Sequence, residues 1–151
     1  MTGPEEAADR PPTSAAMALV LAGRAVEELL GRRLAPLGLS LRLFGALGHL
    51  AREEGLSYTD LARRARVTTQ SMHATVGRLV ELDAVEPAGP GRGRRAGLRV
   101  TERGRRLLAD GHAAVAALDR ELSGALGRSG HALDETALLT VLGLAGRPPV
   151  G

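Results

Sequence analysis

The chain has 151 residues, of which 44% are hydrophobic and 25% charged, and this length predicts one compact domain with an extended arm. Cysteine is absent, which excludes disulfides, thiolate metal sites and a cysteine nucleophile. The longest strongly apolar run, residues 17–22, is much shorter than the ~20 residues that span a bilayer, and it lacks the flanks of a cleavable signal. We therefore expect a cytoplasmic protein with no membrane contact.

The distribution of charge along the chain is more informative than its total. All 20 residues counted as Lys or Arg are arginine, which is typical of a GC-rich genome. Residues 60–106 carry 11 arginines and five acids, a net charge of +6, whereas the other 104 residues carry nine arginines and 12 acids, a net charge of −3. This segregation predicts that one part of the chain faces a polyanion and that the rest has a different task.

The chain is expected to begin with an arm followed by a helix. Residues 1–13 are rich in proline and acids and show no hydrophobic periodicity, so they predict a flexible arm. Helical periodicity begins at Ser14 and predicts a helix over residues 14–37, which Pro36 and Gly38 end. Its apolar stripe is wide enough for burial on more than one side, which indicates packing against a second copy of the chain.

Capping signals place the next helices. Ser40 is an N-cap for a helix over residues 41–54, after which Gly55 takes the left-handed conformation. Residues 57–60 form a capping box that starts a short helix over residues 58–65.

A further helix follows after three residues, capped by Thr68 or Thr69 and ending near Leu82. So short a connection is the spacing of a helix-turn-helix. The remaining expected elements are two strands joined by a glycine- and arginine-rich loop, then a long helix capped by Thr101 and a short final helix: residues 85–87, 98–100, 102–126 and 135–145.

Three stretches of this pattern resemble the MarR family of winged helix-turn-helix transcription regulators. Residues 56–62 (LSYTDLA) are similar to the family's first helix of the motif, residues 67–72 (VTTQSM) to the start of its recognition helix, and residues 94–105 to its wing and the helix after it. The resemblance runs from about residue 14 to residue 146. It implies a mainly α fold with a small β-hairpin wing, flanked by N- and C-terminal dimerisation helices.

Within this single domain, the resemblance implies a DNA-binding lobe at residues 56–106 and dimerisation helices at residues 14–37 and 107–146. Two positions depart from the family pattern. Gly93 replaces the acid that braces the second wing arginine, so we expect a looser wing tip or one ordered only on DNA. Asp83 replaces the glycine that commonly ends the recognition helix, and it tolerates the left-handed conformation less well than glycine.

The predicted recognition helix has two contrasting faces at 100° per residue. Met72, Val76, Leu79 and Val80 are expected to face the core. The opposite face carries small and hydrogen-bonding side chains that suit a major groove. The candidate DNA contacts on and beside this helix are Thr69, Gln70, Ser71, His73, Ala74 and Arg78. An ordinary solvent-exposed helix face is the competing interpretation.

Arginines outside that helix complete the predicted DNA surface. Phosphate contacts that set register are expected from arginines beside the turn, Arg63, Arg64 and Arg66. Arg92, Arg94 and Arg95 lie at the wing tip, and arginine is attracted to the negative potential of a narrow minor groove. The resemblance favours Arg95 as the inserted residue, and a solvated arginine-rich loop is the alternative.

The resemblance also implies a homodimer, a pseudo-palindromic operator with half-sites about 34–36 Å apart, and a small aromatic or phenolic effector bound between the two lobes. The candidate effector residues are Arg24, Phe44, His49 and His112. Histidines on such mixed faces are more often structural or solvated. The four histidines of the chain lack metal-ligand spacing, which leaves a zinc-sensing variant as a minor alternative.

The expected function is a sequence-specific, homodimeric repressor that a small molecule releases from DNA. No enzyme and no cofactor are expected, because G-x-S-x-G, H-E-x-x-H and phosphate-loop motifs are absent. Two alternatives stay open. A protein-binding winged helix is disfavoured by the basic wing, and a sequence-independent, nucleoid-type DNA binder is disfavoured weakly by Gln70, Ser71 and Arg78.

Overall fold

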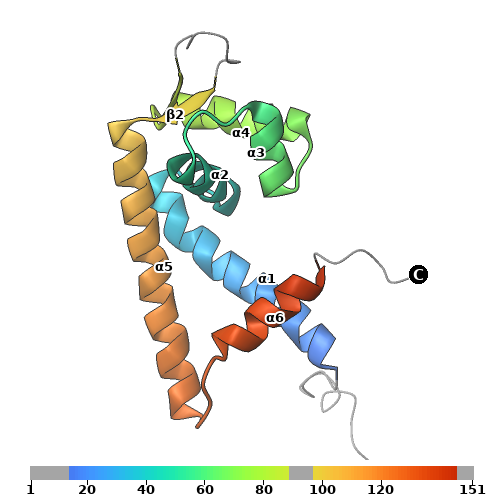
Figure 1. Cartoon of the computed structure of the whole chain (residues 1–151). Helices are drawn as coiled ribbons and strands as arrows, with labels where there is room; N and C mark the ends of the chain where they lie inside the picture. The colour runs from blue at the N-terminus through green and yellow to red at the C-terminus, as the bar shows by residue number, and fades with distance from the viewer. Residues whose placement is uncertain (1–13, 89–96, 146–151) are drawn as a thin grey trace, which may run out of the picture. The chain divides into compact units, whose positions relative to one another are not determined.

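A computed structural model describes residues 14–88 and 97–145, and these residues form a mainly helical chain with one small antiparallel sheet (Figure 1). The chain divides into two compact units, residues 1–115 and 116–151, and the boundary falls within one long helix. The elements of the chain are α1 (Ala15–Leu34), a 3-10 helix (Ala35–Leu37), α2 (Leu41–Arg52), α3 (Tyr58–Ala65), α4 (Thr69–Glu81), β1 (Val85–Pro87), β2 (Leu98–Val100), α5 (Glu102–Arg128) and α6 (Glu135–Ala145). The predicted fold class and element order are confirmed.

Side-chain caps start the helices where the sequence predicts them. The Ser40, Ser57 and Thr68 hydroxyls accept backbone N–H groups at the starts of α2, α3 and α4, at 3.2, 3.1 and 3.1 Å respectively. Each cap satisfies a donor that the first turn of a helix leaves unpaired. Of the two threonines proposed for α4, Thr68 is therefore the cap.

The end of α2 differs from the prediction by two residues. Glu53 is extended (φ −143°, ψ 105°), and Gly55 has φ +82°. The Gly55 N–H donates to the Leu98 carbonyl at 3.1 Å. A Cβ on Gly97 would lie 2.5 Å from the Gly55 Cα, so the chain leaves α2 early because it must pass close to β2.

The C-terminal end of α5 also differs from the prediction. The helix runs to Arg128 through Gly127, and the left-handed turn falls at Gly130 (φ +73°). Since a single glycine weakens a helix without ending it, Gly127 does not stop α5.

The first unit is built around a continuous apolar core. Leu47 and Leu50 of α2, Leu79 of α4 and Leu34 of α1 are fully buried, and the wing strands add Val85, Leu98 and Val100. The strands pair Val85 with Val100 and Glu86 with Arg99. Because α2, α4 and the sheet share one core, the orientation of α4 is set by packing.

The apolar residues of α1 and α6 are largely exposed within the described chain. On α1, Met17 is 53% exposed and Leu21 49%; on α6, Leu139 is 62% exposed and Leu142 65%. In the described part of the chain no single helix is long and apolar enough to cross a membrane, although α1 with its 3-10 extension and α2, bent by 74°, meet the length and composition criteria together.

Candidate nucleic-acid interface

One face of α4 is fixed by the core. Met72, Val76 and Leu79 are completely buried, as predicted. Val80 is 42% exposed, so its predicted place in the core is wrong, and Thr75 is buried instead. Both residues border the apolar stripe, and Thr75 tolerates burial because its hydroxyl donates to the Ser71 carbonyl at 3.0 Å.

The opposite face of α4 is free of the core. The exposed candidates on it are Thr69, Gln70, His73, Ala74 and Arg78, while Ser71 is half-buried. A Cβ on Gly77 would meet nothing within 4 Å, so small side chains leave the middle of this face open to close approach. The Arg78 guanidinium lies 2.6 Å from Glu81 in an exposed ion pair, which is weak enough to exchange for another anion.

A ring contact that the sequence does not predict joins α3 to α4. Tyr58 and His73 stack with ring centroids 4.2 Å apart and planes 16° from parallel. Tyr58 is the only tyrosine of the chain, but its separation of 15 residues from His73 gives no periodic signal. The contact holds the His73 ring against α3 at one edge of the outward face of α4.

Two predicted arginine contacts lie along α3. Arg63 pairs with Asp60 at 3.2 Å, and Arg64 pairs with Glu53 at the end of α2. The Ser57 hydroxyl donates to Asp60 Oδ2 at 2.6 Å. This hydrogen bond, with the adjacent Arg63 charge, holds the pKa of Asp60 below its ordinary value.

The turn between α3 and α4 contains a backbone outlier. Arg66 ends α3 in the left-handed conformation (φ 54°), and its N–H donates to carbonyls of the last turn. Because this conformation is unfavourable for a residue with a Cβ, Arg66 holds the turn at a local energetic cost.

The base of the wing is braced by hydrogen bonds. Arg99 donates to Glu86 Oε1 from Nε at 3.1 Å and from Nη2 at 2.6 Å across the two strands. Asp83, at φ 53°, adopts the left-handed conformation expected for it. Arg103 donates to the Leu82 carbonyl at 2.9 Å. The predicted wing-tip residues Arg92, Arg94 and Arg95, and Gly93, lie outside the described residues.

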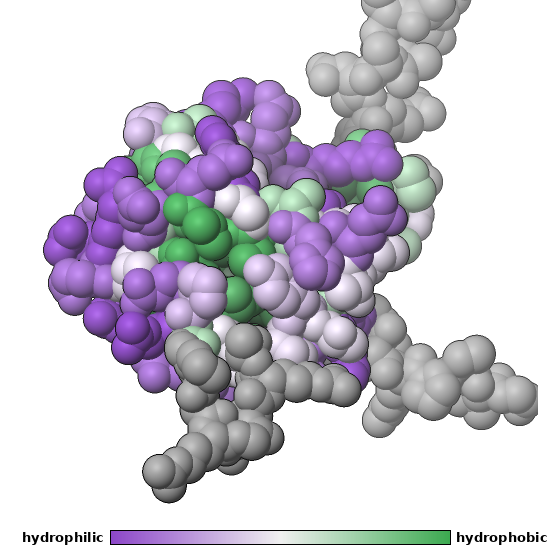
Figure 2. All heavy atoms as spheres, turned by 90° about the horizontal axis from the view of Figure 1, so that it is seen from above, coloured by the Kyte–Doolittle hydropathy of each residue, from purple (hydrophilic) through white to green (hydrophobic). Residues whose placement is uncertain are grey.

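Figure 2 shows the face of the molecule that lies at the top in Figure 1. This face is mostly hydrophilic, with a smaller apolar area near its centre. Exposed charged side chains of α3, α4 and β2 include Arg63, Arg64, Arg78, Glu81 and Arg99. Several of them form exposed ion pairs, so their charges remain accessible to an external anion.

Three of the four predicted effector residues lie together. Phe44 meets His112 edge to face, with ring centroids 5.2 Å apart and planes at 73°. Both line a cavity of about 170 Å³, together with His49, Arg52 and Leu108. Arg24 is exposed on α1 and does not line this cavity.

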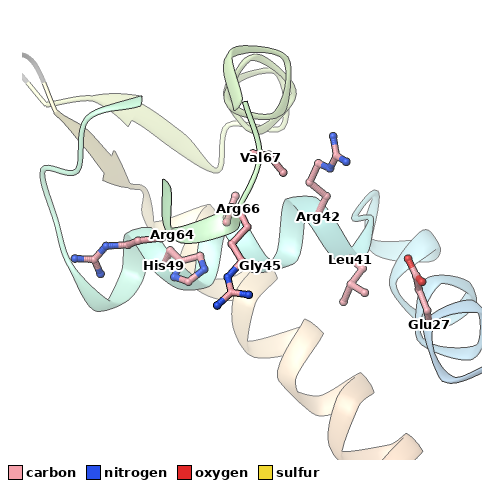
Figure 3. Close-up of a pocket in the computed structure, with 10 residues that line it drawn as sticks. Glu27, Leu41, Arg42, Gly45, His49, Arg64, Arg66 and Val67 are labelled. Carbon is pink, nitrogen blue, oxygen red and sulfur yellow. The ribbon is translucent and has the colours of Figure 1, made fainter. Parts of the chain in front are cut away.

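A second, larger cavity of about 410 Å³ shares Gly45 and His49 with the first, and Arg64 and Arg66 contribute to its lining (Figure 3). Within the described ranges, no three His, Asp or Glu side chains are placed to hold a metal ion.

Comparison with known proteins places the chain in a family. A family model described as MarR family matches residues 37–96. The HTH-type transcriptional repressor Rv2887 of Mycobacterium tuberculosis is 41% identical over 87 residues, which cover 57% of this chain and 63% of the relative. The chain thus spans less than two thirds of the length of the curated relatives that it matches.

Solved structures extend the match over most of the chain. The M. tuberculosis MarR family protein Rv2887 in complex with salicylic acid is 31% identical, with 91% of this chain and 96% of that chain covered and a TM-score of 0.59. The same protein in complex with DNA is 29% identical, with 90% and 100% covered and a TM-score of 0.66. The fold and the helix-turn-helix agree with these matches. Together with the 31% identity over nearly the whole of the salicylic acid-bound relative, they show that the chain belongs to the MarR family.

Proposed function

We propose that the protein is a homodimeric, sequence-specific DNA-binding repressor that a small aromatic acid releases from its operator. The observation that carries the proposal is the division of α4 into a buried face of Met72, Val76 and Leu79 and an open outward face. A helix held in this way, after a short α3 and before a two-stranded wing, suits the major groove. The repressor names of the relatives and the DNA complex of Rv2887 support the proposal.

The proposed contacts divide by role. Gln70 and Arg78 present hydrogen-bonding groups to base edges, and Ala74 allows the helix to approach closely. Arg63 and Arg64 contact phosphates and fix the register. The DNA backbone is contacted near the start of α4 by Thr69, Ser71 and His73. The minor groove is contacted by the wing residues Arg92, Arg94 and Arg95.

Dimerisation is proposed through the helices at residues 14–37 and 107–146. The exposed apolar side chains of α1 and α6 support it, because large apolar surfaces on one chain mark interaction sites. Sedimentation velocity at micromolar concentration tests this proposal. A stable monomer that still binds DNA would contradict it.

The proposed effector is a small aromatic acid bound at the cavity of Phe44, His49 and His112. The aromatic edge of Phe44 and the Arg52 guanidinium at the same cavity suit an aromatic ring with an acidic group. The salicylic acid complex of Rv2887 supports this ligand class. The test is a thermal-shift screen of aromatic acids, in which His112→Ala should remove the shift.

Selection of bound DNA from a random pool tests the proposed function directly. We expect enrichment of a pseudo-palindrome with half-sites one helical turn apart. Affinity for the selected DNA should fall as salt rises, with a slope of about −0.9 per phosphate neutralised in a plot of log K against log salt. Enrichment of no sequence, with the same salt dependence, would instead indicate a sequence-independent DNA binder.

A further inference from the structure

The Tyr58–His73 stack joins the first residue of α3 to the second turn of α4. The ring centroids are 4.2 Å apart and the ring planes are 16° from parallel. Tyr58 is half-buried and packs against the apolar core, whereas His73 is exposed. The stack therefore has one partner held by the core and one partner on the proposed DNA-facing surface.

The backbone beneath both rings is held by neighbouring residues. On α3, the Ser57 hydroxyl accepts the Asp60 N–H at 3.1 Å and donates to Asp60 Oδ2 at 2.6 Å, which fixes the first turn of the helix, where Tyr58 lies. On α4, the residue before His73 is Met72, whose side chain is completely buried. The remaining freedom of His73 lies in its side-chain torsions, and the stack with Tyr58 restricts them.

The stacked imidazole keeps its hydrogen-bonding edge. Ring nitrogens donate and accept in the plane of the ring, and Tyr58 covers one face of that ring. Gly77, four residues further along α4, has no side chain that could cover the imidazole from that end. Within residues 14–88 and 97–145, no hydrogen bond or ion pair of the His73 ring is found. The ring edge is therefore available to an acceptor outside the chain.

The place of His73 on α4 suits a phosphate acceptor. His73 lies at the edge of the outward face, on the side of α3, whereas Ala74 and Arg78 also belong to that face. A helix that lies in the major groove meets base edges with its outward face and the DNA backbone with its flanks. The first turn of α4 contains no acidic residue, so no carboxylate there repels a phosphate.

We propose that Tyr58 is a positioning residue for DNA binding, which holds the His73 imidazole so that a ring N–H donates to a phosphate oxygen beside the major groove. The inference rests on the proposed function and adds to it a residue that makes no DNA contact of its own. Ordering of a free side chain on binding weakens affinity by roughly 2- to 12-fold, and a ring that is already stacked avoids this loss. Because a phosphate carries no base identity, Tyr58 contributes affinity and register.

Fluorescence anisotropy of the selected DNA with the full-length chain tests this inference. Tyr58→Leu keeps an apolar side chain against the core but removes the aromatic face, and it should weaken binding roughly 2- to 12-fold. Tyr58→Phe keeps the aromatic face without the hydroxyl and should bind with the parent affinity. His73→Phe keeps a ring that can stack but has no N–H, and it should weaken binding at least as much as Tyr58→Leu.

A double-mutant cycle and a spectroscopic signal separate positioning from a general effect on the fold. In the His73→Ala chain, the added Tyr58→Leu change should have no further effect on DNA affinity. In proton NMR of the free chain, the Tyr58 ring current should move the His73 ring signals upfield, and these signals are assigned by their loss in His73→Ala. The upfield shift should persist in Tyr58→Phe and disappear in Tyr58→Leu, while urea denaturation shows which chains are folded.

Each outcome decides the inference. Equal losses of affinity in Tyr58→Phe and Tyr58→Leu would overturn it, because the Tyr58 hydroxyl would then be the contact. Parent affinity in His73→Phe would overturn it too, since the stack would then only brace α3 against α4, and this result decides even if Tyr58→Leu does not fold. Equal effects of Tyr58→Leu with and without His73 would also contradict it. These three results leave the proposed function standing, whereas absence of DNA binding by the parent chain would refute the proposed function and the inference together.

Discussion

Replacing Arg78 with glutamine separates the DNA-facing role of α4 from its structural role. The Arg78 and Glu81 side chains are 60% and 64% exposed, and exposed pairs of this kind contribute only about 0–1 kcal/mol to stability. The free energy of unfolding of Arg78→Gln should therefore fall by less than about 1 kcal/mol. Loss of an arginine contact to a base costs about 1–3 kcal/mol, which corresponds to roughly a 5- to 150-fold weaker Kd for each half-site.

The next residue along the helix provides the matched control. Leu79 is fully buried, and Leu→Ala at such positions costs about 2–5 kcal/mol of stability. Leu79→Ala should thus lower the free energy of unfolding strongly, whereas Arg78→Gln, at the neighbouring residue, should lower the affinity for DNA. Glu81→Gln should leave DNA affinity unchanged or raise it, because it removes a negative charge and frees Arg78.

The assay combines urea denaturation with fluorescence anisotropy of the selected DNA at fixed salt concentration. If Arg78→Gln bound that DNA with the parent affinity while folding normally, the outward face of α4 would not contact DNA at this position. If Arg78→Gln lost as much stability as Leu79→Ala, Arg78 would be part of the packing and its assignment to the outward face would be wrong.

Three other predictions address the fold, an ionisable group and the assembly. Gly104→Ala would place a Cβ 2.1 Å from the Ala84 carbonyl oxygen and 2.8 Å from Val100, so thermal denaturation should show a loss of about 1–3 kcal/mol or more. In an NMR titration the pKa of the Asp60 carboxyl should lie below its ordinary value, because the Ser57 hydroxyl donates to it and Arg63 lies close by, and Ser57→Ala should raise that pKa. Because the pKa of Asp60 is lowered on folding, the stability it contributes is present above the unfolded value of about 3.9 and is lost as pH falls through the folded value. Leu142→Asp, at a residue 65% exposed on α6, should dissociate the proposed dimer in sedimentation velocity.

The sequence predicts well the elements whose signals are local. Ser40, Ser57 and Thr68 are confirmed as N-caps because a cap depends on its own hydroxyl and the next three residues. The strands and the order of helices follow from periodicity and turn residues in the same way. The end of α2 is predicted less well, since it depends on the passage of Gly55 beside β2, a contact between residues about 40 positions apart.

The candidate site also combines features with a local sequence signal and features that depend on contacts between distant elements. The buried stripe of α4 follows from 3.6-residue periodicity, but periodicity alone does not choose between Thr75 and Val80, which border the stripe on its two sides. The Tyr58–His73 stack and the Arg64–Glu53 pair join different elements, so no spacing rule indicates them. The left-handed conformation of Arg66 is not predicted either, because arginine carries no propensity signal for it.

The position of α2 gives the cavity of Phe44 and His112 a physical route to the proposed DNA-facing surface. Gly45 and His49 of α2 line this cavity and also the adjoining larger one. α2 also shares the core that holds α4, through Leu47 and Leu50. Because a packed core transmits small displacements instead of absorbing them, we expect a ligand in this cavity that shifts α2 to shift the helix proposed to enter the major groove as well. A ligand changes DNA affinity only by the difference between its affinities for the DNA-bound and the DNA-free protein.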